Sequence, residues 1–203
     1  TYLSRPETDV VYLMAMNMLG NGLFHADHHE DTLSVREAEL SMMRRLGGSE
    51  HYILTAQCNL AVAYAKLGRH ESALRIEMEV YAQKSALYGR DNESTLLTAG
   101  NLASTLVDAL QQFDEARAFL RDRIPEAVRA LGKDNATTLR LERMCAQCHY
   151  ENDDASRDDV TTAITALDDL DRRCTRIYGA SHPQTRGTRY LLEEARETLA
   201  RAK

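Results

Sequence analysis

The sequence is poor in residues that interrupt or stiffen a chain. It has 3 prolines, no tryptophan and 6% aromatic residues among 203 positions, while 43% of its residues are hydrophobic. Proline breaks helices, and so few of them, together with a core that must be built mainly from alanine and leucine, favour a helical protein. The composition therefore predicts an all-α domain or array.

Several other features are missing, and each absence reduces the number of functions that we expect for the protein. No apolar run approaches the ~18 residues that cross a bilayer, so we expect no membrane association. The net charge of −6 argues against nucleic acid as a partner, because phosphate binding needs clustered Lys and Arg. No secretory segment precedes the four cysteines, which predicts reduced thiols and a cytoplasmic protein. Because the chain begins at Thr1, we also expect it to be a fragment or a processed form.

The usual signatures of catalysis are absent as well. The Gly20–Gly22 and Gly47–Gly48 segments lack the Lys-Ser/Thr that a phosphate-binding loop requires. Serine, histidine and aspartate are scattered without the pattern of a catalytic triad. We therefore predict a protein that is not an enzyme and that uses no cofactor.

What the sequence does contain is an internal repeat. Residues 54–61 read LTAQCNLA and residues 96–103 read LLTAGNLA. A leucine or tyrosine followed by glycine recurs at Gly47, Gly89, Gly132 and Gly179, at spacings of 42, 43 and 47 residues. Glycine after an apolar helical stretch ends a helix, and the polar residues that follow can cap the next one. Each interval has room for two helices, and self-similarity at this period indicates a repeat array.

We accordingly expect one array over residues 1–203. Its units are about 6–47, 48–89, 90–132 and 133–179, and a capping helix spans 182–201. The extra residue of the third unit is assigned to the turn at Gln111-Gln112 between its two helices.

The first unit allows two alignments. Asn17 lies 42 residues before Asn59, but this register would run a helix through Gly20 and Gly22. We prefer to match residues 22–24 with residues 68–70, so that the helix ends at residues 20–22 and the Asn17 spacing is a coincidence.

The repeated phrase resembles the tetratricopeptide repeats of kinesin light chains, which have about 42 residues. The resemblance rests on Asn-Leu-Ala in the first helix of a unit, on Gly before the second helix, and on Leu-Gly-x-Asp-Asn at its end. It implies a right-handed superhelical solenoid of antiparallel helix pairs with a concave groove.

The resemblance also implies which residues face that groove. In such arrays, asparagine and basic residues of the first helices hold a partner's backbone and acidic side chains. The positions carried over are Asn59, Val62, Lys66, Asn101, Ser104, Val107, Arg140, Arg143 and Gln147. The alternative is that the asparagines bridge adjacent helices, and the sequence does not separate the two.

Two short segments have the composition of metal sites. Cys145-Ala146-Gln147-Cys148-His149 matches the C-x-x-C-H string of haem attachment, yet it lies inside a repeat helix, where cysteine acts as a small buried hydrophobe. The segment from His25 to Asp31 is rich in His, Asp and Glu, and we interpret it as a solvated loop between helices, with opportunistic metal binding as the alternative. We assign no metal site to either segment.

The expected function is a non-catalytic protein-interaction module, a scaffold or adaptor that binds a protein or peptide segment in its groove. The alternative is a regulatory or ligand-sensing domain of a larger enzyme or signalling protein. The oligomeric state is not predicted.

Overall fold

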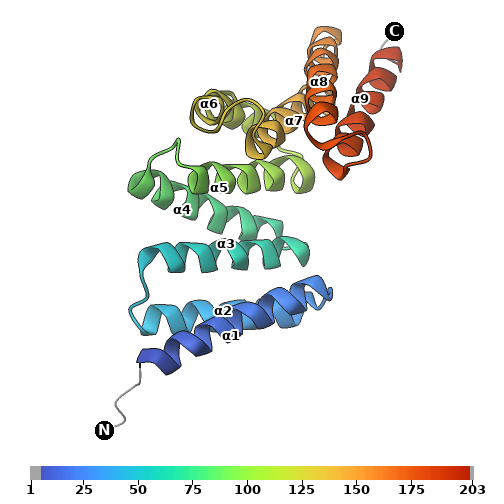
Figure 1. The fold of residues 1–203 in the computed structure, drawn as a ribbon. Coiled ribbons are helices and arrows are strands. Elements are labelled where there is room, and N and C mark those ends of the chain that lie inside the picture. Colours follow the sequence, from blue (N-terminus) through green and yellow to red (C-terminus); the bar gives the residue numbers. More distant parts are fainter. Residues whose placement is uncertain (1–5, 202–203) are drawn as a thin grey trace. The chain divides into compact units, whose positions relative to one another are not determined.

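The structure is a computed structural model that describes residues 6–201. All regular elements in this part of the chain are helical (Figure 1), so the predicted all-α class is confirmed. The helices are α1 (Pro6–His25), α2 (His29–Arg45), α3 (Glu50–Lys66), α4 (His70–Tyr88), α5 (Glu93–Ser104), α6 (Phe113–Leu131), α7 (Ala136–Tyr150), α8 (Arg157–Tyr178) and α9 (Pro183–Arg201), with a π-helical turn η1 (Thr105–Ala109) after α5. The chain divides into two compact units, Thr1–Lys84 and Ser85–Lys203, each of which we describe by itself.

The turns between helices follow the predicted glycines. Gly132 and Gly179 end α6 and α8 with φ of 87° and 85°, a left-handed conformation that glycine adopts without a steric penalty. The polar residues that follow Gly89 and Gly132 cap the next helices. The Asn92 side chain accepts a hydrogen bond from the Ser94 amide at 2.9 Å, and Asn135 accepts one from the Thr137 amide at 2.8 Å.

The expected end of the first helix is wrong. α1 continues through Gly20 and Gly22 to His25, and the chain turns at Asp27, which has a φ of 60°. Asp27 therefore takes the place that Gly68, with a φ of 72°, takes between α3 and α4. Within the helices, the register that aligns Asn17 with Asn59 is the correct one, because both asparagines lie well inside the first helix of a pair. In that register the turn at Asp27 comes one residue later than the turn at Gly68.

Gly20 lies inside α1 for a reason of packing. The guanidinium of Arg36, from α2, lies against it, and a Cβ at Gly20 would come within 2.8 Å of the Arg36 Cζ. Arg36 is itself buried and pairs with the buried Glu39 at 2.7 Å. A glycine in a helix interior costs about 1 kcal/mol relative to alanine, and here it makes room for the guanidinium.

The core of the first unit lies between α2 and α3. It contains Leu33, Leu40, Ala56, Leu60 and Ala63, with Ile53 and Met43 packed at its edge. The apolar positions of α3 recur at spacings of three and four, so a single stripe of the helix faces α2.

The third helix pair contains an irregularity that the sequence did not reveal. After Ser104 the chain forms the π-helical turn η1, and the Gln112 amide then bonds the carbonyl of Leu106, six residues back. The corresponding bond after α3 joins Arg69 to Tyr64, five residues back. The extra residue of the third unit is thus taken up in the last turn of the first helix, directly before Gln111, rather than by the turn alone.

The second unit has its largest described core among α7, α8 and α9. Leu139 and Ala146 of α7 pack with Val160, Leu167 and the other inward residues of α8, and Leu192 and Ala195 of α9 complete the cluster. α8 and α9 lie side by side in Figure 1, and α9 begins at Pro183 as expected. None of the helices in the described part of the chain is long and apolar enough to span a bilayer.

Candidate partner-binding face

The candidate site in the second unit is a surface that α5, α7 and α9 share. α7 contacts both of the other helices. Arg140 of α7 reaches toward α5, where its Nη1 donates a hydrogen bond to Oδ1 of Asn101 at 3.1 Å. Its guanidinium lies over Gly100, since a Cβ there would be 3.5 Å from Nη1. We call this surface the α5–α7–α9 face and define it by Asn101, Ser104, Arg140, Arg143, Gln147 and Gln184.

The other arginine of the face points in the opposite direction along the row of helices. Nη1 of Arg143 lies 3.4 Å from Oε1 of Gln184, on α9, and 3.1 Å from the place a Cβ would take at Gly187. Arg140 and Arg143 are three residues apart on one helix face, and both are half-buried. Each therefore links α7 to a neighbouring helix while part of its side chain stays open to solvent.

The next turn of the face carries shorter polar side chains. The Ser104 hydroxyl donates to Oδ2 of Asp108 at 2.7 Å, and Nε2 of Gln147 donates to Oε2 of Glu151 at 3.1 Å. Val107 does not fit its expected place on this face, because its side chain is fully buried within the π-helical turn. Asp108, seven residues after Asn101, is exposed in its stead.

The face ends at a polar pocket of about 510 Å³. Three of its lining residues, Tyr150, Glu151 and Glu194, form one group in which the Tyr150 hydroxyl lies 3.4 Å from Oε2 of Glu194. Partial burial raises the pKa of Glu151, against the hydrogen bond from Gln147. Burial and the two nearby carboxylates also raise the pKa of the Tyr150 phenol, which therefore stays protonated. The face is thus basic over the middle of α7 and acidic at its C-terminal end.

The raised pKa of Glu151 gives a pH-dependent prediction. A carboxyl group whose pKa is higher in the folded state favours folding fully below its unfolded pKa of about 4.3, and this advantage is lost as the pH rises through the folded value. We expect Glu151→Gln to raise the melting temperature at neutral pH, and the difference from the unmodified chain to disappear near pH 4. Thermal melts at both pH values check this, and an increase of equal size at both would contradict it.

In the first unit, the predicted residues lie on α3. Asn59 and Val62 are half-buried, and the exposed Lys66 places its Nζ 5.9 Å from the centre of the Phe24 ring. Asn17, the equivalent of Asn59 on α1, donates through Nδ2 to Oε1 of the buried Glu39 at 3.1 Å. Asn101, in its bond to Arg140, thus has the bridging role that the sequence left open for it, and Asn17 bridges α1 and α2 in a similar way.

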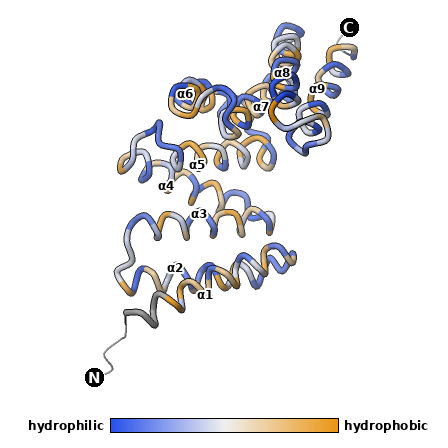
Figure 2. The backbone as a smooth tube through the Cα atoms, viewed as in Figure 1, coloured by the Kyte–Doolittle hydropathy of each residue, from blue (hydrophilic) through white to orange (hydrophobic). Residues whose placement is uncertain are grey.

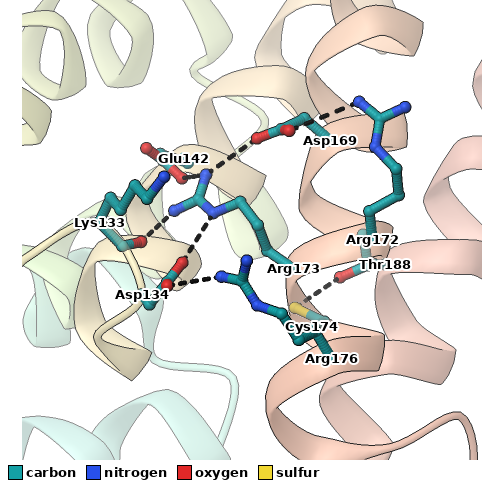
Figure 3. Close-up of polar contacts among 9 residues, drawn as sticks. All are labelled: Lys133, Asp134, Glu142, Asp169, Arg172, Arg173, Cys174, Arg176 and Thr188. Atoms are coloured by element: carbon teal, nitrogen blue, oxygen red, sulfur yellow. Dashed lines mark hydrogen bonds and ion pairs between the residues drawn. The ribbon is translucent and has the colours of Figure 1, made fainter.

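Figure 3 shows a second group of charges, which fixes α8 against α7 and which the sequence analysis missed. Arg173 of α8 bonds Glu142 at 2.8 Å, Asp169 at 3.2 Å and Asp134 at 3.3 Å, and it also bonds the carbonyl of Lys133. Burial raises the pKa of Glu142, while the Arg173 charge opposes this increase. The group ties α8 to α7 and to the turn before it, and so supports the helix that carries Arg140 and Arg143.

The two cysteines of the C-x-x-C-H string are thiols packed within the helical array. Cys148 is buried and Cys145 half-buried, and neither forms a disulfide. Burial raises the pKa of both thiols, that of Cys148 to about 12, which opposes the thiolate that a metal site needs. Among the described residues, no three His, Cys, Asp or Glu side chains are grouped as metal ligands, and the His25–Asp31 segment divides into the end of α1, a turn and the start of α2.

Antiparallel helix pairs that recur every 42 to 47 residues define the class of α-helical repeat proteins, which form solenoids. Within this class, the chain belongs to the tetratricopeptide repeat family, whose model matches residues 12–86 and 52–125 and so covers more than half of it. Repeats of this family generally serve as protein-interaction modules.

Solved structures share the fold. The nearly identical TPR-like repeats from Podosopora anserina, assigned to a kinesin light chain, superpose with a TM-score of 0.74 at 19% identity, over 93% of this chain and 87% of that one. A variant of the same protein gives a TM-score of 0.73 at 19% identity, over 94% and 92%. BtubC (BKLC) from P. vanneervenii gives 0.73 at 14% identity, over 97% and 78%. The comparison with curated proteins gave no significant match.

Proposed function

We propose that this chain is a non-catalytic interaction module that binds an extended or helical segment of a partner protein on its α5–α7–α9 face. The observation that carries the proposal is the placement of Arg140 and Arg143. Two half-buried arginines lie one turn apart on α7, and the guanidinium of each is close to a glycine of a different neighbouring helix. A guanidinium held in this way has lost much of its side-chain freedom before a partner arrives, which lowers the entropic cost of binding.

The face offers a partner complementary polar groups, and we propose a catalytic role for none of them. Arginine can hold a carboxylate through two parallel hydrogen bonds, and the Gln147 amide can both donate to and accept from a peptide bond. Asn101 contributes by positioning Arg140 through their 3.1 Å hydrogen bond. In the first unit, Asn59, Val62 and Lys66 form a second proposed contact set. Solved tetratricopeptide repeats of the kinesin-light-chain type share this fold.

We further propose a cytoplasmic location. All four cysteines are free, Cys148 and Cys174 are buried, and Cys174 belongs to the core cluster of α7, α8 and α9. A reducing compartment keeps such thiols unpaired.

The binding prediction concerns Arg143. Peptides that bind the purified chain can be selected from a displayed random library, and the affinity of one of them measured by titration. We expect Arg143→Glu to weaken binding at least tenfold, because it replaces a donor for carboxylates with a like charge. Asn101→Ala is expected to weaken binding by a smaller factor, since it removes one hydrogen bond that positions Arg140 and leaves the guanidinium in place. Helical content should not change in either variant.

Arg121→Glu is the matched control. Arg121 is an exposed arginine on α6, away from the α5–α7–α9 face, and among the described residues its one ion pair is the 4.0 Å contact with its neighbour Asp122. The same change of charge there should leave the affinity unchanged. Equal losses at Arg121 and Arg143 would mean that net charge, and not this face, determines binding.

A further inference from the structure

The first helix presents an apolar surface that no described part of its unit covers. Val11, Met14 and Met18 are 64%, 63% and 74% exposed, and their spacing of three and four places them on one side of α1. Tyr12 and Leu19 are also more than half exposed and lie beside them. Figure 2 shows the hydrophobic segments that recur along α1.

The repeat register shows what kind of surface this is. Residues 42 positions later are Ile53, Ala56 and Leu60, on α3. These residues belong to the core cluster in which α3 packs against Leu33 and Leu40 of α2. The same helix face is therefore buried against another helix in the second repeat and open in the first, so its shape and spacing suit an apolar helix.

The charge pattern of α1 indicates which helix that is. Residues 10–24 contain no Asp, Glu, Lys, Arg or His, although the whole chain is 28% charged. In a symmetric interface, each patch meets its own copy, so a charged patch would place like charges opposite one another, whereas an uncharged patch does not. Methionine side chains adapt easily to a partner surface, including that of a second α1.

We propose that two copies of this chain associate through α1, with the two helices antiparallel about a two-fold axis near Met14. The faces defined by Val11, Met14 and Met18 then cover each other. The α5–α7–α9 face belongs to the other compact unit, so this proposal does not depend on the proposed binding function.

Sedimentation equilibrium of the 203-residue chain over a range of concentrations tests the proposal. We expect a dimer that dissociates on dilution. Met18→Glu should increase the dissociation constant about a hundredfold or more, because both copies lose an apolar contact and each new carboxylate is buried against the apolar face of the other α1. The substituted side chain is largely exposed in the single chain, so circular dichroism should show unchanged helicity.

Met78→Glu is the matched control, since Met78 is a half-exposed methionine of α4 in the same unit. This variant should dimerise like the unmodified chain. As a second measurement, Met14→Cys should form a disulfide between copies under mild oxidation, and Met78→Cys should not. A chain that is monomeric at every concentration, or a dimer that Met18→Glu leaves intact, would overturn the proposal.

Discussion

Glu39→Leu is expected to reduce the free energy of unfolding by about 3–5 kcal/mol, because it leaves the guanidinium of Arg36 buried without its anion. The side chains of Arg36 and Glu39 are almost completely buried, and Nη1 of Arg36 lies 2.7 Å from Oε2 of Glu39. The Asn17 amide, which donates to Glu39, loses its acceptor in the same change. Denaturant unfolding followed by circular dichroism measures the effect.

The double variant Arg36→Met/Glu39→Leu separates the cost of an unpaired charge from that of lost packing. Replacing a buried ion pair by apolar side chains of similar volume is often neutral or stabilising. We therefore expect the double variant to recover most of the stability that Glu39→Leu loses. A single variant that costs less than about 1 kcal/mol, or a double variant no more stable than the single one, would contradict this account of the pair.

Arg173→Met should have the second-largest effect, about 2 kcal/mol, because a single side chain bonds three carboxylates and a backbone carbonyl. Without it, Glu142 remains partly buried with no nearby cation among its present partners. The pKa of Glu142 is already raised by burial and should rise further. Chemical denaturation of the variant measures the loss.

The pH dependence of that loss identifies its cause. A carboxylate that is harder to ionise in the folded state destabilises the fold only where it is charged, so the cost of Arg173→Met should be largest at neutral pH and should shrink below about pH 4. Arg172→Met is the control, because the Arg172 side chain is 73% exposed and makes one ion pair at 3.5 Å. It should change stability by less than about 0.5 kcal/mol. A pH-independent loss in Arg173→Met would point to lost packing instead.

Much of the fold could be predicted because its signals are local. The glycines at 132 and 179 are left-handed residues in the structure, and Asn92 and Asn135 cap the helices that follow. These features depend on a few neighbouring residues and on backbone stereochemistry. The position of α9 followed from the same reasoning.

The first unit was misread because a local rule conflicts with a distant contact. Glycine usually weakens a helix, so residues 20–22 suggested an end to α1. The helix continues, and the Arg36 guanidinium from α2 occupies the space above Gly20. No rule that considers only neighbouring residues could have anticipated this contact. The repeat period itself, which placed Asn17 in register with Asn59, was the better guide.

The candidate site could be predicted only in outline. The repeat register places Arg140 and Arg143 on α7, but their partners Asn101 and Gln184 are 39 and 41 residues away. The burial of Val107 depends on the π-helical turn. The one extra residue of the third unit indicates that this unit contains an irregularity, but it does not show where the irregularity lies. The Arg173 group likewise joins residues that are close only after folding.

The central claim is that partners bind the α5–α7–α9 face, and site-specific photo-crosslinking tests it most directly. A photoreactive phenylalanine analogue is placed at Gln147 on that face, or at the exposed Thr165 of α8, and each protein is irradiated with a peptide selected on the unmodified chain. The account predicts crosslinks from position 147 that unlabelled peptide suppresses, and none from position 165. Crosslinks from position 165 alone would place the binding surface elsewhere and contradict the account.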